Sequence, residues 1–384
     1  MNIHWSKVMK NKIGTGLAAI VIFMALSPQI GLTQAADKYR LAVESSTQLI
    51  IRTMAAQKIP GLSIAVAVDG KTVWSKGFGY ADLENNLKAT PATRFRIASV
   101  SKPITAAAMA RLYEQGKLDV DAPVQEYVPE FPSKGVVITA RQLVGHLSGI
   151  RHLRRDPDPE KDEFYDRKKY CRNVTEGVKR FQADPLDFAP GTKFGYSSKG
   201  FVLLSAVLER ISGREYLQLM QEEVFGPLGM SSTTTDDNRR IIPNRSSFYS
   251  LDANKNVIHA PYIDQSCDWA GGGLLSTSED MVRFGTAHLQ SGYLKQTTLD
   301  IMFTSQKTLD GKATGTGWGW RINRDMEGRL YYYHPGENVG GRSYLWVYPK
   351  EGVVVAMAHN LTGAHLGSIT EIARRFVTAA KHSN

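Results

Sequence analysis

The sequence has few cysteines and lacks the motifs that mark common metal and nucleotide sites. Only Cys171 and Cys267 occur among its 384 residues, and neither has a metal-ligand spacing. The 9 histidines form no His-Glu-x-x-His and no other zinc spacing, so we expect His146 and His152 to be loop and packing residues. The segment at Gly315 lacks the lysine of a P-loop. These absences disfavour zinc and nucleotide chemistry, and we expect no metal and no cofactor.

Other absences bear on fold and partners. There is no Gly-x-Ser-x-Gly motif, which disfavours an α/β-hydrolase. The formal charge is +10, but the basic residues are spread out and form no long run, so we expect no nucleic-acid partner. An oxidising compartment would permit a disulfide between the two cysteines. A chain of this length does not need one to fold, and we expect the pair to stay unbridged.

The first 35 residues have the pattern of a secretory signal peptide. Three lysines up to Lys12 precede the apolar run Leu17–Leu26, and small residues follow at Thr33–Ala35. We therefore expect cleavage near Ala35 or Ala36 and a periplasmic or extracellular protein with no stable membrane span. The apolar run is short for a span, but an uncleaved N-terminal anchor is the alternative.

The periodicity of the mature chain predicts an α+β protein. Residues 62–68 and 72–79 are expected strands joined by an Asp-Gly turn, and residues 118–265 are mostly helices and loops, with 151–172 as a surface loop. Strands resume near the C-terminus, at 317–322, 329–334, 342–348 and 353–360. Helices at 37–57 and 366–381 should flank the resulting antiparallel sheet. We expect a sheet lobe (about 37–98 and 270–384) with a helical lobe (about 99–269) inserted into it.

A serine and a lysine begin the helix expected after Phe95–Ala98. Ser99 and Lys102 are three residues apart and should share a face, where an amine can take the proton of a serine nucleophile. The start of a helix also offers free N–H groups to an oxyanion. Such a spacing is more often an N-cap serine beside a solvated lysine, so the assignment depends on partners elsewhere in the chain.

Two later segments could supply those partners. Tyr196 and Ser198 precede a helix, and a tyrosine near a lysine charge could act as a base with the serine as a relay. A structural tyrosine with a capping serine is the simpler interpretation of that segment alone. His334 ends an expected strand, and the following Gly336 and Glu337 could place a backbone N–H beside the nucleophile.

These three motifs, in this order, resemble those of the serine β-lactamase and penicillin-binding protein superfamily. The Tyr-x-Ser form is similar to class C β-lactamases, D-aminopeptidases and related esterases. Similar segments occur along nearly the whole mature chain, at Leu118–Val124, Tyr127–Pro132, His146–His152, Ala270–Thr277 and Gly317–Trp320. The second and third of these most resemble the mitochondrial serine β-lactamase-like proteins and their bacterial relatives, a group described as proteolytic.

The resemblance implies one catalytic domain over 37–384 with defined residue roles. Ser99 would be the nucleophile, Lys102 its proton partner and Tyr196 the general base, supported by Ser198. Oxyanion donors would be the backbone N–H groups of Ser99 and Glu337, with Gly336 and Arg342 beside the substrate and His334 in place of the usual lysine.

We therefore expect a serine hydrolase acting through an acyl-enzyme on a peptide or amide substrate. A carboxylesterase or weak class C-like β-lactamase is the nearest alternative, and a non-catalytic penicillin-binding or scaffold protein is another. The superfamily usually has a hydroxyl residue where this chain has Pro335, so carboxylate-bearing substrates should bind weakly unless Arg342 restores the charge. Protonation of His334 should improve penicillin turnover toward pH 6. The sequence specifies neither the particular substrate nor the oligomeric state.

Overall fold

The computed structural model describes residues 38–158, 160–165, 167–367 and 369–381. The expected signal peptide therefore lies outside the described residues. Within the described part, no helix is both long and apolar enough to cross a membrane.

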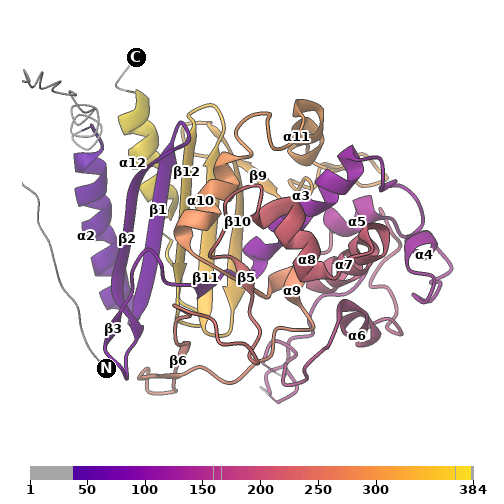
Figure 1. Ribbon diagram of the computed structural model, residues 1–384, viewed down its shortest axis with the longest axis horizontal. Helices are drawn as coiled ribbons and strands as arrows, with labels where there is room; N and C mark the ends of the chain where they lie inside the picture. Colours follow the sequence, from indigo (N-terminus) through magenta and orange to yellow (C-terminus); the bar gives the residue numbers. More distant parts are fainter. Residues whose placement is uncertain (1–37, 159, 166, 368, 382–384) are drawn as a thin grey trace, which may run out of the picture.

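A seven-stranded antiparallel sheet forms one half of the molecule (Figure 1). Its strand order is β3-β2-β1-β12-β11-β10-β9. The strands are β1 (Gly61–Val68), β2 (Lys71–Asp82), β3 (Leu87–Lys88), β9 (Arg321–Arg324), β10 (Leu330–Asn338), β11 (Gly341–Tyr348) and β12 (Val353–His359). Because β1 pairs with β12, the early hairpin and the late strands form one sheet, as the sequence predicts.

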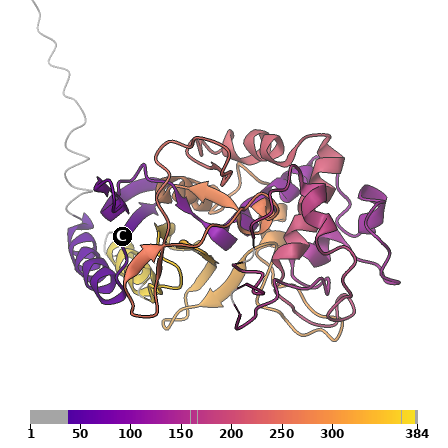
Figure 2. The same ribbon diagram turned by 90° about the horizontal axis from the view of Figure 1, so that it is seen from below.

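Both faces of this sheet are covered by helices. Successive side chains of β1 alternate between two hydrophobic clusters, with Ile64 on one face and Ala65 on the other. Helices α2 (Arg40–Gln57) and α12 (Ile369–Lys381) pack on the first face (Figures 1 and 2). Helix α10 (Ser278–Thr286), which the sequence pattern did not predict, covers the second. A Cβ on Gly285 would lie 2.6 Å from Val354 Cγ1, so this glycine lets α10 approach the sheet closely.

The helices between the two parts of the sheet pack around α3 and α7. They are α3 (Ser101–Glu114), α4 (Val124–Tyr127), α5 (Ala140–Val144), α6 (Val174–Lys179), α7 (Ser198–Ser212), α8 (Tyr216–Met220) with the following π-helical turn Gln221–Phe225, α9 (Trp269–Gly272) and α11 (Gln296–Met302). Two small sheets connect them to the large one: β4 (Phe95–Arg96), β8 (Leu274–Ser276) and β5 (Thr234–Thr235), and the hairpin of β6 (Tyr249–Leu251) and β7 (Val257–His259).

Two sequence expectations change in the structure. The strand expected over 317–322 begins only at Arg321, because Gly319 has φ +73° and packs against Pro103 at the start of α3. The segment 151–172 is not simply a surface loop, since Arg151 and Arg167 within it are buried. Arg151 is held by ion pairs that the sequence pattern does not reveal.

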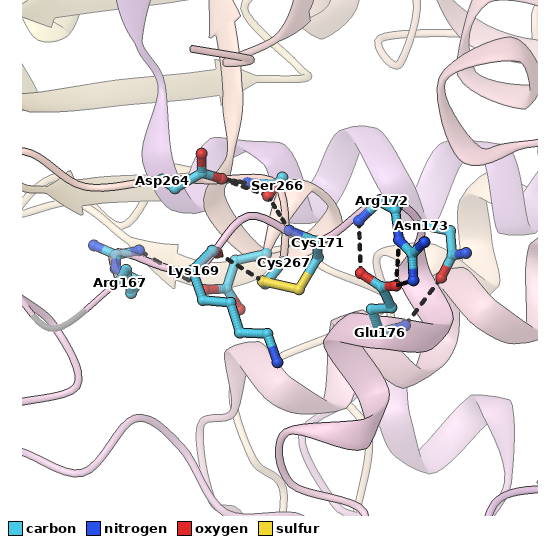
Figure 3. Close-up of a disulfide and its surroundings, with 10 residues drawn as sticks. Arg167, Lys169, Cys171, Arg172, Asn173, Glu176, Asp264, Ser266 and Cys267 are labelled. Carbon is cyan, nitrogen blue, oxygen red and sulfur yellow. Dashed lines mark hydrogen bonds and ion pairs between the residues drawn. A yellow bond between two sulfur atoms is a disulfide. The ribbon is translucent and has the colours of Figure 1, made fainter. Parts of the chain in front are cut away.

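The expectation of unbridged cysteines is wrong. Cys171 and Cys267 form a disulfide across 96 residues of sequence, with Cα atoms 5.0 Å apart (Figure 3). Both are buried, and the Cys171 N–H donates to Ser266 Oγ at 2.7 Å. The size of the chain bears only on whether a bridge is needed, whereas tertiary packing brings these two segments together.

Candidate active site

Ser99 is kept partly accessible by a tight turn between β4 and α3. It lies in a 3₁₀ turn, Ala98–Val100, so the α-helix itself begins only at Ser101. The turn is strained, because Ala98 has φ +46°. From Phe95 to Ala110, Ser99 is the one residue that is not buried. The strain and burial around it present a single hydroxyl to the solvent.

Lys102 connects this hydroxyl to the second motif. Its side chain is fully buried, and Nζ donates to Ser99 Oγ at 3.2 Å and to Ser198 Oγ at 2.9 Å. The third contact of Nζ is with the carbonyl oxygen of Gly271 in α9. Nζ also lies 4.8 Å from the centre of the Tyr196 ring. The structure thus brings together the four residues of the first two motifs.

The environment of Lys102 makes its amine less basic than that of an exposed lysine. Burial lowers the pKa of Lys102 below its usual value, although the Tyr196 phenol and the Asp268 carboxylate oppose this change. A protonated amine has three donors for its three contacts, whereas a neutral amine has a lone pair that can accept the Ser99 proton. Lys102 can therefore act as a base once it has lost its proton, and its burial makes that loss easier.

Histidines surround Tyr196 and hold its segment in place. The ring of His146 is 4.5 Å and that of His152 is 5.1 Å from the Tyr196 ring, centre to centre. Each histidine also accepts a backbone N–H at 3.1 Å through Nδ1, His146 from Ser197 and His152 from Ser198. Burial lowers the pKa of both, that of His152 to about 3. They are neutral acceptors that fix the Tyr-x-Ser segment, a role that their sequence spacing did not suggest.

The third motif lies directly against the Ser99 turn. Strand β9 pairs with β10 over Leu330–Tyr333, and among the described residues no strand pairs with the same edge beyond that point. At this edge, a Cβ on Gly336 would lie 2.3 Å from Ile97 O and 3.0 Å from the Ser99 backbone nitrogen. Only glycine allows this approach, which places the Gly336 backbone beside a candidate oxyanion donor.

A cleft of about 300 Å³ opens between these segments. Its lining includes Ser99, Tyr196 and Gly336, together with positively charged residues that the sequence analysis did not place there, Arg155 and Arg321. It also includes His152, Leu153, Phe164, Pro335, Glu337 and Arg342.

Comparison with known proteins identifies the family of this fold and site. The family model described as Beta-lactamase matches residues 47–379. The chain belongs to the beta-lactamase family. The mitochondrial serine beta-lactamase-like protein LACTB of Homo sapiens is 34% identical to it, over 89% of this chain and 81% of that protein. The family is one of serine hydrolases, with a beta-lactamase/transpeptidase-like fold.

Solved structures agree with this assignment. The octameric penicillin-binding protein homologue from Pyrococcus abyssi has a TM-score of 0.75 and 25% identity, covering 89% of this chain and 78% of that one. A D-stereospecific amidohydrolase from a Streptomyces species has a TM-score of 0.69 and 26% identity, covering 83% of this chain and 95% of that one.

His334 is the first residue of the third motif. Its side chain is buried, and its Nδ1–H donates to the Pro335 carbonyl oxygen at 2.7 Å. Burial, with the nearby charges of Lys102 and Arg321, lowers the pKa of His334 well below its usual value. This shift opposes protonation of His334 in mild acid, so the gain in penicillin turnover expected toward pH 6 loses its support.

Arg342 is placed to supply the positive charge that His334 lacks. One of its terminal nitrogens lies 3.3 Å from a carboxylate oxygen of Glu337. Its Nε and Nη1 are buried and have no hydrogen-bond partner among the described residues. The single contact with Glu337 leaves part of the guanidinium charge unmatched, so Arg342 would gain from an anionic group in the cleft that it lines.

Groups of three or more histidine, cysteine, aspartate or glutamate side chains able to hold a metal are absent from the described part of the chain.

Proposed function

We propose that the protein is a serine hydrolase that forms an acyl-enzyme at Ser99 and cleaves a peptide or amide bond. The observation that carries this proposal is the contact of an accessible serine hydroxyl with a buried lysine of lowered pKa, 3.2 Å away. A structural N-cap serine would have no need of a lysine stripped of water.

The residues of the cleft suggest how the reaction would run. Ser99 Oγ attacks the substrate carbonyl carbon and passes its proton to Lys102 and Tyr196, which together act as the general base. The backbone N–H groups of Ser99 and Glu337 stabilise the resulting oxyanion. Lys102 and Tyr196 then return the proton to the leaving amine, with Ser198 as a relay. A water molecule then attacks the acyl carbon, and the same groups carry its proton in the reverse direction.

The choice of an amide bond rests on similarity. The Streptomyces structure is that of an amidohydrolase, which acts on this type of bond. Carboxylesterase or weak class C-like β-lactamase activity is the second candidate, because an acyl-enzyme can form from an ester or a lactam by the same steps. A non-catalytic penicillin-binding or scaffold role is disfavoured by the connected hydroxyl and amine groups.

Covalent labelling tests the proposal. A fluorophosphonate probe should label the wild-type protein, and Ser99→Ala should abolish the label without loss of fold. Ser101→Ala is the matched control, since Ser101 is two residues away and buried, with Oγ accepting the Leu274 N–H at 3.3 Å. Mapping of the label to Ser101 or Ser198 would refute the assignment. A panel of esters, β-lactams and D- and L-peptides would then identify the substrate class.

We also propose that the protein is exported. The support is the N-terminal sequence pattern and the buried disulfide, which is typical of oxidising compartments. The similar protein from Homo sapiens is mitochondrial, so a different destination is the competing outcome. N-terminal sequencing of the protein recovered from its native cell should give a start near residue 36; an intact N-terminus in the cytosol would contradict export.

A further inference from the structure

Asn338 lies at the end of β10, two residues beyond Gly336, and its side chain is buried. Its Nδ2 donates to the carbonyl oxygen of Gly272 in α9 at 3.2 Å. Its Oδ1 accepts from Arg167 and from the Val339 N–H at 2.9 Å. One amide group therefore connects the strand beside the nucleophile to the helix turn on the opposite side of the site.

The orientation of this amide is fixed by Arg167. A guanidinium has donors only, so the atom of Asn338 that faces it must be the oxygen, and the NH₂ group must face Gly272. Arg167 is itself buried and also donates to Gln265 Oε1 at 3.2 Å. Burial lowers the pKa of Arg167 to about 10, which leaves it protonated at neutral pH.

Asn338 and Lys102 donate hydrogen bonds to the carbonyl oxygens of two consecutive residues. Gly272 follows Gly271, whose carbonyl oxygen accepts from Lys102 Nζ. Neither glycine has a side chain to anchor it, and a Cβ on Gly271 would lie 2.8 Å from Ser198 O. The N–H groups of both glycines donate to Asp268 O, so the contact of Asn338 with the Gly272 carbonyl adds to these backbone bonds in setting the position of the Gly271 carbonyl.

We propose that Asn338 is a positioning residue for Lys102. By fixing Gly272, it sets the carbonyl of Gly271 and so the distance of the amine from Ser99, while its backbone continues the strand that faces the oxyanion. This inference rests on the proposed function of Ser99 and adds a coupling between the two sides of its site.

A matched pair of substitutions tests the coupling. Asn338→Leu removes both the donor to Gly272 and the oxygen that accepts from Arg167, without adding a charge. Asn360→Leu is the control, because Asn360 is equally buried, accepts the Gly61 N–H at 2.8 Å and donates to Tyr80 O at 3.2 Å, in contacts that join β1, β2 and the end of β12. Both variants should unfold at lower temperature than the wild type. The second-order rate of fluorophosphonate labelling at Ser99 is measured for each as a function of pH.

We expect labelling by Asn338→Leu to fall about 10- to 100-fold, since a small misplacement of a catalytic group has costs of this size. The labelling rate rises with pH on the acid side of its pH profile, which is called the acid limb here. The midpoint of this limb should move to lower pH in Asn338→Leu, because a lysine that loses an acceptor holds its proton less tightly. Asn360→Leu should label within about 3-fold of wild type with an unmoved limb, as expected for a change that affects stability alone.

Equal losses in the two variants, or an unchanged limb in Asn338→Leu, would overturn the inference while leaving the proposed function intact. Absence of labelling in the wild-type protein would overturn both. If the leucine variants do not fold, Asn338→Ser and Asn360→Ser give the same comparison, since serine is smaller and remains polar.

Discussion

Arg342 offers the sharpest test of what the cleft binds. We expect Arg342→Met to weaken the reaction of anionic substrates selectively. Methionine retains much of the length and apolar character of the arginine stem but removes the charge and all five donors. The catalytic contacts between Ser99, Lys102 and Ser198 do not involve Arg342, so the reaction of uncharged substrates should continue.

The magnitude follows from the state of the guanidinium. Glu337 occupies one nitrogen at 3.3 Å, and Nε and Nη1 have no partner in the described part of the structure. A substrate carboxylate in the cleft could accept from the terminal nitrogen that faces Glu337, since both residues line the cleft. One charge-assisted hydrogen bond contributes about 1.5–3 kcal/mol, which corresponds to a change of roughly 10- to 150-fold in acylation by an anionic substrate.

Benzylpenicillin and its methyl ester form a suitable pair, because they differ only in the carboxylate. Acylation rates of both should be measured on wild-type and Arg342→Met protein, with p-nitrophenyl acetate as a reference substrate. We expect a loss of roughly 10- to 150-fold for the acid and less than about 3-fold for the ester and the reference. Substitution of the exposed Arg52 on α2 controls for a general loss of charge. Equal losses for acid and ester, or no loss for the acid, would refute the reasoning.

Other predictions follow from single features. Tyr196→Phe should lower kcat/KM about 10²- to 10⁴-fold with little change in Tm, and near-normal turnover would leave the base role to Lys102 alone. Replacing both Cys171 and Cys267 by serine should lower the free energy of unfolding by about 2–5 kcal/mol, and an unchanged urea midpoint would contradict this. Burial raises the pKa of Glu209 from 4.5 to about 7, so the folded state keeps a proton that the unfolded chain releases. Stability should therefore fall as pH rises from 4.5 through 7, and Glu209→Gln should flatten that fall in urea titrations at several pH values; an unchanged slope would exclude this group as its cause.

Local features of the chain were predictable because they depend on a few neighbouring residues. The hairpin turn at Asp69 and Gly70 forms with φ values of +48° and +78°, as its sequence predicts. The residue pattern of the expected strands and the helices expected at the two ends of the mature chain predicted the correct fold class. Ser99 and Lys102 are adjacent in any helical turn, so their contact at 3.2 Å needs no distant segment, although a 3₁₀ turn replaces the expected start of the α-helix.

Contacts between distant segments were decided by the tertiary structure. The sequence predicts one sheet, but the strand order is set by packing: β1 pairs with β12, and β10 thereby reaches the Ser99 turn. The histidines around Tyr196, the arginines of the cleft and the disulfide all join segments whose separate sequences carry no sign of the partner. The physical reason is range: dihedral preferences and side-chain periodicity act over a few residues, whereas the approach of distant segments depends on how the whole chain packs its two hydrophobic clusters.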